Sequence, residues 1–462
     1  TRVHGLLKNI SMDELMRCLQ QLDNTSSAGY DGISPALLKL ATLTTWEHEK
    51  PRTEDDIKRD GLHAKFNQYC VDRSEEMGYG AGEAIPLGPI PPPTTKVTYE
   101  PNLTRQLLLR ILNLCLQSGD MPNVEKLGII TALPKSEGLV TSTDNMRPIT
   151  VGSAINRLLH KLLADRLSVA MVRHGLIDKS QFAYIPGGDI HEPIAATTAC
   201  YRDRKEYAKG CFAIYYDISK AYDTILWSSI ETAMLEIGLE KQFIDFVLAA
   251  LSGSRVAMRT NVSGNVTREV TLSKSIKQGC PLAPLLFIIV MDELHRGLRE
   301  AKKGYVLGDP GQPGGAMVSS RGYSDDTYIV AHTIKDLRYL NQHVVHPFFV
   351  KHGLTINAIK TKVTGRLPGT EGEAFTGTVW WPGSETPFET VPPDMAVKYL
   401  GAYVSLDLDW KTQVNKMQGY LYGLLSHIDS GRLTTLQGVA VAKYVTGPRM
   451  DIGMRHADIP RQ

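Results

Sequence analysis

The 462-residue chain has little of what marks secreted, membrane-spanning or strongly charged proteins. It has six cysteines and no C-x-x-C pair, which argues against a disulfide framework and against a zinc knuckle. Its longest apolar run, near residues 285–291, is far shorter than the roughly 18 residues of a membrane span. Lysine and arginine number 51 against 49 aspartate and glutamate, so composition alone indicates no polyanionic partner. We expect a protein that works in a reducing compartment and without a membrane.

The chain does contain apolar patterns with both helical and strand periods. Helices are expected over residues 6–22, 34–41, 103–116, 154–173, 228–237, 241–251, 281–299 and 335–353, and along the tail from residue 414. Strands are expected over residues 127–133, 211–216, 317–320 and 327–331, and near Val379 and Tyr399. Residues 42–100 are charged and then rich in glycine and proline, which predicts an insertion or a partly disordered loop. Helices between antiparallel hairpins favour the α+β class.

Two acidic motifs adjoin predicted strands. Asp217 directly follows the apolar residues 211–216, and Asp325 and Asp326 lie in a hairpin turn expected over residues 322–326. If both elements share a sheet, three carboxylates meet, and charges about 4 Å apart repel by about 4 kcal/mol at an effective dielectric near 20. Bound Mg²⁺ or Mn²⁺ would relieve that repulsion, and two such ions suit nucleotidyl transfer. The alternative is that the Asp-Asp pair is ordinary turn chemistry.

The residues around these motifs form an ordered series. Residues 216–223 read Y-D-I-S-K-A-Y-D, residues 278–287 read Q-G-C-P-L-A-P-L-L-F, and residues 323–326 read Y-S-D-D. The series continues with G-L-T-I-N at 353–357, K-T-K at 360–362 and Y-L-G at 399–401, and it is preceded by A-G-Y-D-G-I at 28–33, L-P-K at 133–135, R-P-I at 147–149 and the segment 181–187. Over roughly residues 6–40 and 103–444 the chain resembles the reverse transcriptases of non-LTR (LINE-like) retrotransposons.

This resemblance implies an α+β right-hand polymerase whose fingers and palm contain an antiparallel sheet backed by helices. It implies an N-terminal fingers extension over residues 1–41, a variable insertion over 42–102, fingers over 103–210, a palm over 211–405 and the start of a truncated helical thumb over 406–462. Because the chain opens on Thr1 without an initiator methionine, we expect a piece of a longer protein or a processed product.

The resemblance also implies roles for individual residues. Asp217, Asp325 and Asp326 would be the catalytic carboxylates and, with the carbonyl of Ile218, would hold two Mg²⁺ or Mn²⁺ ions. The incoming nucleotide would be bound by Lys135, Arg147, Tyr222, Gln278, Gly279 and Lys360. The primer and template would lie against Tyr323, Tyr399, Leu400 and Gly401.

Simple chemistry fits several of these roles. Lys135 and Arg147 can neutralise a triphosphate through charge-assisted hydrogen bonds, and the ring of Tyr222 can exclude a 2′-hydroxyl by its shape. Gly279 can let the backbone approach a base pair, and either Lys360 or Lys362 can give a proton to the leaving pyrophosphate. The alternatives are an ordinary core position for Tyr222 and ordinary surface positions for the two cations.

Some local features depart from these patterns. Gly188 and Asp189 stand where many relatives carry a basic residue, and Ala283 replaces a common serine. The sequence His191-Glu192-Pro193 is not expected to form a zinc-protease helix, because proline should block the helix.

The sequence therefore predicts an RNA-directed DNA polymerase that uses an RNA template, a DNA primer or target and deoxynucleoside triphosphates. Since such elements act on chromosomes, we expect it inside the cell and in the nucleus. No endonuclease or RNase H domain is expected in this chain, and the truncated thumb predicts weak processivity or inactivity of this chain alone. Oligomeric state is not predicted. Two alternatives remain open: a domesticated RNA-binding or structural protein that keeps the fold without activity, and a group II maturase or telomerase-like relative.

Overall fold

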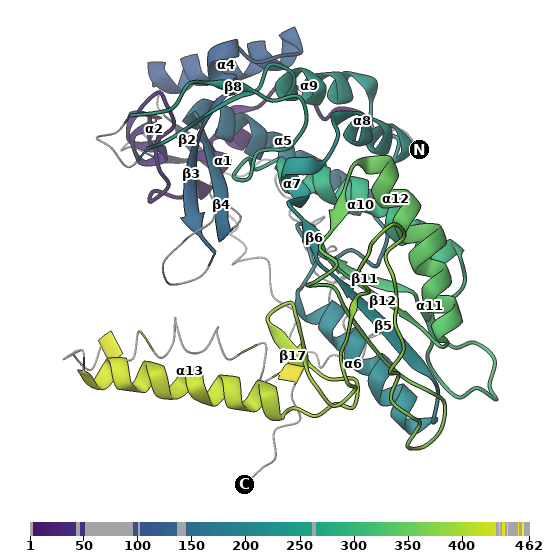
Figure 1. Ribbon diagram of the computed structural model, residues 1–462. Helices are drawn as coiled ribbons and strands as arrows, with labels where there is room; N and C mark the ends of the chain where they lie inside the picture. Colours follow the sequence, from purple (N-terminus) through teal and green to yellow (C-terminus); the bar gives the residue numbers. More distant parts are fainter. Residues whose placement is uncertain are drawn as a thin grey trace.

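The computed structural model describes residues 3–42, 47–50, 96–99, 102–135, 145–260 and 265–430, with isolated positions between 434 and 456. Figure 1 shows three parts arranged in an open arc. A helical body contains α4 (Leu103–Ser118) and α5 (Ala154–Arg173), a sheet body contains β5 (Cys211–Tyr216) and β12 (Asp326–Ala331), and the long helix α13 (Lys411–Ser430) lies opposite the helical body. Within the described residues, no helix combines the length and the apolar character needed to cross a bilayer.

The helical body surrounds a four-stranded sheet of order β4-β3-β7-β8. Its strands are β3 (Leu127–Pro134), β4 (Met146–Gly152), β7 (Arg255–Met258) and β8 (Val270–Thr271). Its remaining helices are α1 (Met12–Gln21), α2 (Pro35–Thr42), the 3₁₀ turn η1 (Asn123–Lys126), α7 (Ala221–Thr224), α8 (Trp227–Glu236) and α9 (Lys241–Leu251). Strand β3 pairs antiparallel with β4 and parallel with β7.

Two short strands lie within the predicted insertion, near its two ends. Strands β1 (Glu47–Lys50) and β2 (Lys96–Tyr99) pair antiparallel, so the ends of the segment come together. The prediction of partial disorder concerns residues that lie outside the described part of the chain.

The sheet body is built around the strand that carries Asp217. Its main sheet has the order β11-β12-β5-β14-β15, with β11 (Ser320–Tyr323), β14 (Lys362–Arg366) and β15 (Glu389–Thr390). Strand β5 lies in the middle, antiparallel to both β12 and β14. All six residues of β5 are buried, which explains why its sequence is continuously apolar rather than alternating.

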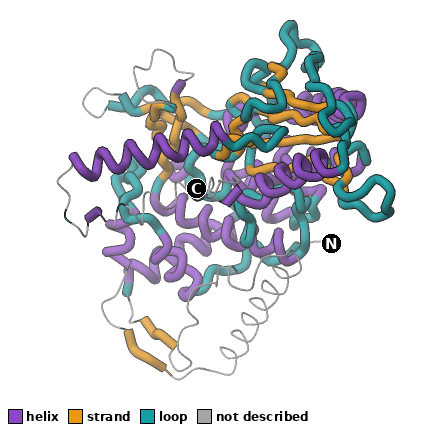
Figure 2. The backbone as a smooth tube through the Cα atoms, turned by 90° about the horizontal axis from the view of Figure 1, so that it is seen from below, coloured by secondary structure: helices purple, strands orange, loops and turns teal. Residues whose placement is uncertain are grey.

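Both faces of this sheet are covered. Phe212 and Ile214 belong to one core with α10 (Ala283–Glu300), α11 (Ile334–Leu340), the π-helix η3 (Asn341–Val345) and α12 (His346–His352). Ala213 and Tyr215 belong to a second core with α6 (His191–Glu206) and the hairpin of β16 (Val397–Tyr399) and β17 (Ala402–Val404). Figure 2 shows the strands side by side with helices next to them, and α13 projecting away.

Smaller strands complete this body. Strand β6 (Ile218–Ser219) pairs with β13 (Thr355–Ile356), and β9 (Tyr305–Val306) pairs with β10 (Met317–Val318). The predicted strand near Tyr399 is confirmed as β16, whereas Val379 lies outside the strands. Strand β4 and helix α6 were not predicted.

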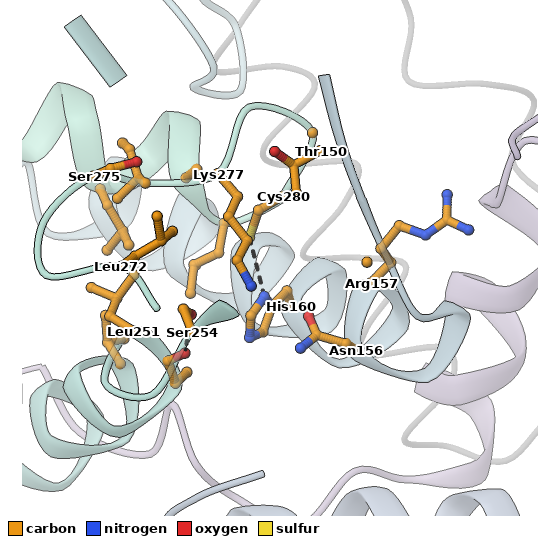
Figure 3. A pocket seen from close by; sticks show the side chains of 18 of the residues that line it. Thr150, Asn156, Arg157, His160, Leu251, Ser254, Leu272, Ser275, Lys277 and Cys280 are labelled. Carbon is orange, nitrogen blue, oxygen red and sulfur yellow. Dashed lines mark hydrogen bonds between the residues drawn. The ribbon is translucent and has the colours of Figure 1, made fainter. Parts of the chain in front are cut away.

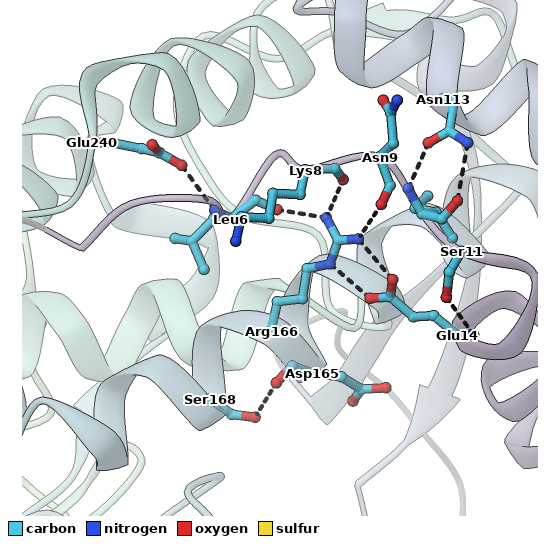
Figure 4. Close-up of polar contacts among 11 residues, drawn as sticks. Leu6, Lys8, Asn9, Ser11, Glu14, Asn113, Asp165, Arg166, Ser168 and Glu240 are labelled. Atoms are coloured by element: carbon cyan, nitrogen blue, oxygen red, sulfur yellow. Dashed lines mark hydrogen bonds and ion pairs between the residues drawn. The ribbon is translucent and has the colours of Figure 1, made fainter. Parts of the chain in front are cut away.

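The predicted helix over residues 6–22 is too long at its start. Helix α1 begins at Met12, because the Ser11 hydroxyl accepts a hydrogen bond from the backbone N–H of Glu14 at 3.2 Å. The residues before it form a turn that is bound by Arg166 of α5, which donates to the carbonyls of Leu6 and Lys8 and forms a bidentate pair with Glu14 (Figure 4). The N-terminal segment is therefore fixed to the helical body.

The expectation that Pro193 blocks a helix is wrong. Helix α6 begins at His191, so Pro193 is its third residue. A proline is tolerated in the first turn because the N–H groups there have no partner within the helix.

The main sheet of the sheet body is covered on both faces. Replacing Ile214 in its middle strand tests how much the stability of the protein depends on this packing. Ile214→Ala should lower the free energy of unfolding by about 2–5 kcal/mol, because the side chain is fully buried in the middle strand. Ile359→Ala, at a residue that is 77% exposed, is the matched control and should change it by less than about 0.5 kcal/mol. Equal effects in chemical denaturation would contradict the packing described.

Candidate active site

The register of the central strands brings the predicted acidic motifs together. Tyr216 of β5 pairs with Thr327 of β12, so the next position outward sets Asp217 opposite Asp326. Tyr323 pairs with Asp326, which leaves only Ser324 and Asp325 in the turn. The turn predicted over residues 322–326 is therefore too long. Both strands end at one edge of the sheet, and this edge carries all three carboxylates.

The two-residue turn has an unusual backbone. Ser324 has φ +60°, a left-handed conformation that serine rarely adopts. The buried side chain of Gln181 holds it from behind: its Oε1 accepts from the backbone N–H of Ser324 at 3.0 Å, and its Nε2 donates to the Ser324 carbonyl at 3.4 Å. The same Oε1 accepts from the N–H groups of Phe182 and Ala183 at 3.1 Å. Gln181 thus fixes the turn that presents Asp325.

The three carboxylates affect one another electrostatically. Burial and the negative charge of Asp217 raise the pKa of Asp325, and the positive charge of Arg147 opposes this. Burial and the charges of Asp325 and Asp217 raise the pKa of Asp326 to about 6, against the effect of Lys398. Ionising all three together is therefore unfavourable unless positive charge is added.

The donor set suits a hard divalent cation. Carboxylate oxygens are the ligands that Mg²⁺ and Mn²⁺ prefer, and a cation would remove the repulsion that raises these pKa values. Within the described parts of the chain, no three His, Cys, Asp or Glu side chains form a preformed metal-binding group. The carboxylates are thus neighbours at one sheet edge rather than a closed cage.

The loop after β13 fixes Asp217 through its backbone. The Asp217 N–H donates to the Thr361 hydroxyl at 3.2 Å, and its carbonyl accepts from the N–H of Asn357 at 2.8 Å. Ile218 pairs with Ile356 in the adjoining two-stranded sheet. Lys360 lies in this loop with an exposed side chain, whereas Lys362 is ion-paired with Glu389. Of the two lysines, Lys360 is better placed to act at the site.

Tyr222 lies between the core and the acidic turn. Its ring stacks on Phe287 of α10, with centroids 5.2 Å apart and an angle of 16° between the planes. Burial raises the pKa of its phenol, which also interacts with Tyr184 and Ser324 and senses the charge of Asp325. The residue is therefore packed on one side and directed at the turn on the other.

Two predicted cations come from the hairpin of β3 and β4. Arg147 pairs with Leu133 in the strand register, and Lys135 follows the end of β3. The charge of Arg147 acts on Asp325, and that of Lys135 acts on Asp223. Figure 1 shows the ends of both strands directed into the space between the helical body and α13. This hairpin therefore extends from the helical body toward the acidic edge.

Gln278 and Gly279 dock against the same hairpin. The Gln278 carbonyl accepts from the Thr150 N–H at 2.6 Å. Gly279 has φ +116°, and a Cβ there would lie 2.5 Å from the Thr150 carbonyl oxygen. The close approach that requires glycine is thus an approach to β4 rather than only to a base pair, which the sequence did not predict.

The predicted primer and template residues differ in their exposure. Leu400 and Gly401 form the turn between β16 and β17, with φ values of +51° and +86°. Tyr399 is 4% exposed, packs against Tyr215 and donates to the Arg321 carbonyl at 3.2 Å. Its side chain supports the hairpin from the core, and the primer or template role of Tyr399 stays a prediction. Tyr323 is half-buried beside the acidic turn.

Two residues at the site were not singled out from sequence. Lys398 on the β16–β17 hairpin acts on Asp326. Gln181 was noted only as part of a motif, and its grip on the turn depends on long-range hydrogen bonds that no local pattern reveals.

This sheet edge, with carboxylates opposed across β5 and β12, is the candidate active site. The family model described as reverse transcriptase (RNA-dependent DNA polymerase) matches residues 133–404, more than half of the chain. The chain belongs to this family.

The chain is similar to several retrotransposon proteins. It is 30% identical over 260 residues to a Pol polyprotein of the R2 element of Popillia japonica, covering 56% of this chain and 35% of that protein. It is 29% identical over 259 residues to the Pol polyprotein of element R2DM of Drosophila melanogaster, covering 56% and 23%. The chain thus spans about a third or less of these relatives. The expectation of a non-LTR reverse transcriptase domain is confirmed.

Among solved structures, the chain is similar to telomerase from Candida albicans in complex with a fragment of telomeric RNA. The TM-score is 0.40 at 13% identity, covering 62% of this chain and 46% of that one. The right-hand polymerase fold is assigned from the family match.

Removing the support behind the acidic turn should cost stability. Gln181→Leu keeps the volume but leaves the N–H groups of Ser324 and Ala183 without their acceptor, so we expect the free energy of unfolding to fall by about 2–4 kcal/mol. Gln312→Leu, at an exposed position, should be neutral. Chemical denaturation of both variants checks this, and an unchanged Gln181→Leu protein would contradict the role assigned to Gln181.

Proposed function

We propose that this chain is an RNA-directed DNA polymerase that adds deoxynucleotides to the 3′-hydroxyl of a DNA primer on an RNA template. The observation that carries the proposal is the strand register that sets Asp217 opposite Asp326, with Asp325 in the adjoining turn. A protein that only binds RNA gains nothing from carboxylates gathered beside a polyanion, because they repel it.

Asp217, Asp325 and Asp326, with the carbonyl of Ile218, would hold two Mg²⁺ or Mn²⁺ ions. Such ions supply activation of the attacking hydroxyl and stabilisation of the leaving pyrophosphate. The pKa values of Asp325 and Asp326, raised by burial and by neighbouring carboxylates, support this assignment, since they mark a site that needs added positive charge. Gln181 and Thr361 would keep the carboxyl groups oriented toward the reacting atoms.

The basic residues around the site suit a nucleoside triphosphate. Arg147 and Lys135 would neutralise the phosphates from the β3–β4 hairpin, and Lys360 would protonate the pyrophosphate from the opposite loop. Gln278 and Gly279, which are held against Thr150, would form the surface that the new base pair contacts. Lys398, facing Asp326, is suited to contact the primer backbone together with the turn at Leu400 and Gly401.

The parts of the molecule divide this work. Residues 1–41 and 103–210 would be the fingers, residues 211–405 the palm, and α13 the start of a thumb. These bounds do not coincide with the two bodies, because α6 packs in the sheet body whereas α7, α8, α9, β7 and β8 belong to the helical body. Residues 42–102 would be a variable insertion. The natural partners would be an RNA template, a DNA primer or target and deoxynucleoside triphosphates, and the place of action would be the nucleus.

Asp325→Asn should abolish the activity without unfolding the protein. We expect primer extension on an RNA template with Mg²⁺ to fall by about a hundredfold or more, a loss of the size caused by removing a charge-stabilising group from an active site. The raised pKa of Asp325 means that its ionised form destabilises the fold, so the variant should be at least as stable as the parent near pH 7.

Asp309→Asn is the matched control, because Asp309 is an exposed turn aspartate in the same body. It should extend primers at the parental rate. Retained extension in Asp325→Asn would contradict the role given to this carboxylate. A parental protein that binds RNA but extends no primer would favour the domesticated RNA-binding protein instead.

Tyr222→Val should relax the choice of sugar. Without the ring, the preference for deoxynucleotides over ribonucleotides, measured as a ratio of kcat/KM values, should fall about tenfold or more. Tyr222→Phe keeps the ring stacked on Phe287 and should retain the preference. Equal selectivity in all three proteins would show that Tyr222 is only a packing residue.

A further inference from the structure

A cysteine and a histidine meet in a small cavity behind the Gln278–Gly279 segment. His160 comes from α5, Cys280 from the loop before α10, and their Nδ1 and Sγ atoms are 3.1 Å apart (Figure 3). The cavity has a volume of about 40 Å³, and its wall includes Thr150, Lys277 and Leu286. Its size admits only small molecules.

The histidine of this pair has unused hydrogen-bonding capacity. His160 is 8% exposed, it lines the cavity, and its Nε2 atom has no hydrogen-bond partner among the described residues. A buried imidazole with a partner only at sulfur is unusual, because buried polar atoms are nearly always paired. The polymerase chemistry proposed above does not use it.

Cys280 also differs from the other described cysteines. It is partly exposed, whereas the rest are buried: Cys18, Cys115, Cys200 and Cys211. Burial raises the pKa of each of those four thiols, to about 12 for Cys18 and Cys200. Among the described cysteines, only Cys280 is both partly exposed and next to an imidazole.

We propose that Cys280 is a site of covalent modification by small, soft electrophiles, with His160 as the base that takes the thiol proton. The thiol gives its proton to Nδ1 of His160, and the sulfur lone pair attacks the electrophilic carbon. With an alkyl iodide, the carbon–sulfur bond forms as the carbon–iodine bond breaks and iodide leaves. No oxidant or cofactor takes part.

The electrostatics of the pair agree with its geometry. Burial alone raises the pKa of the Cys280 thiol, but the charge and hydrogen bond of His160 and the N–H groups of Leu282 and Ala283 lower it to about 7. The other charged groups nearby are Lys277 on the same loop, Arg157 on α5 and Arg255 on β7, with Glu125 of η1 at the cavity wall. Cys280 is thus half ionised at neutral pH.

Modification of Cys280 would alter the nucleotide-binding segment at Gln278 and Gly279. This consequence rests on the proposed function. Cys280 is the next residue after Gly279, whose backbone lies against the Thr150 carbonyl with no space even for a methyl group. A group added to the sulfur pushes on this loop and disturbs the Gln278–Thr150 hydrogen bond. We expect weaker binding of the incoming nucleotide, seen as a higher KM.

Labelling with iodoacetamide tests whether Cys280 is the modified residue. In a Cys70→Ser background, which removes the one cysteine outside the described residues, the folded chain should gain a single carbamidomethyl group, on Cys280 by peptide mapping. The labelling rate should rise with pH around a midpoint near 7 rather than near the ordinary thiol value of about 8.5. A midpoint at or above 8.5, or labelling of a different cysteine, overturns the proposal.

His160→Asn separates the imidazole from the rest of the loop. At pH 7 the thiolate fraction should drop from about half to about 3% or less, while intrinsic nucleophilicity rises about fivefold, so the rate falls at least about threefold. The midpoint should move up by more than one pH unit. Circular dichroism confirms folding of the variant, and an unmoved midpoint shows that His160 is not the base.

A polymerase assay of labelled protein tests independently whether modification of Cys280 weakens nucleotide binding. Labelling should raise the KM for deoxynucleotide in the parent but leave the Cys280→Ser variant at its own unlabelled value. Labelling of Cys280 without any change in KM overturns the link to nucleotide binding while the modification site stands. A parent that never extends primers contradicts the proposed function, whereas the labelling midpoint does not depend on it.

Discussion

The repulsion among three carboxylates at one sheet edge is the constraint on which the site depends. Asp217 and Asp326 face each other across adjacent strands, with Asp325 in the turn beside them. Burial and neighbouring carboxylates raise the pKa values of Asp325 and Asp326, so keeping these groups ionised costs free energy. Added positive charge lowers this cost. Arg147 and Lys398, from two different parts of the fold, supply only part of the required positive charge.

The rest of the fold keeps this unfavourable arrangement in place. Strand β5 is buried on both faces, so its end cannot move away from β12 without opening two cores. The strained turn at Ser324 is fixed by Gln181, and the backbone of Asp217 is fixed by Thr361 and Asn357. Rigid support of this kind lets a protein position charges that would otherwise separate. The β3–β4 hairpin and the Gln278–Gly279 segment then form a second unit that approaches the acidic edge from the helical body.

The sequence was sufficient to predict the acidic motifs and several elements, since β5, α5, α9 and α10 have strong apolar periods and Asp217 follows a continuously apolar strand. It was less informative where tertiary contacts decide the outcome. Helix α1 begins late because Arg166, some 160 residues away, binds the carbonyls of the turn that precedes it. Tyr399 looks like a surface aromatic in a hairpin but packs on Tyr215. Gln181 and the His160–Cys280 pair join distant segments, so no local pattern could reveal them.

Binding of Mn²⁺, followed by electron paramagnetic resonance, tests the central claim most directly, because it reports the acidic edge without requiring polymerase activity. We expect the parental chain to bind Mn²⁺ near pH 7.5 and to lose affinity as the pH falls through about 6, where Asp326 takes up a proton. Asp217→Asn should remove this binding. Mn²⁺ binding that is equally strong in the Asp217→Asn variant, or that does not change between pH 7.5 and 5, would contradict the account.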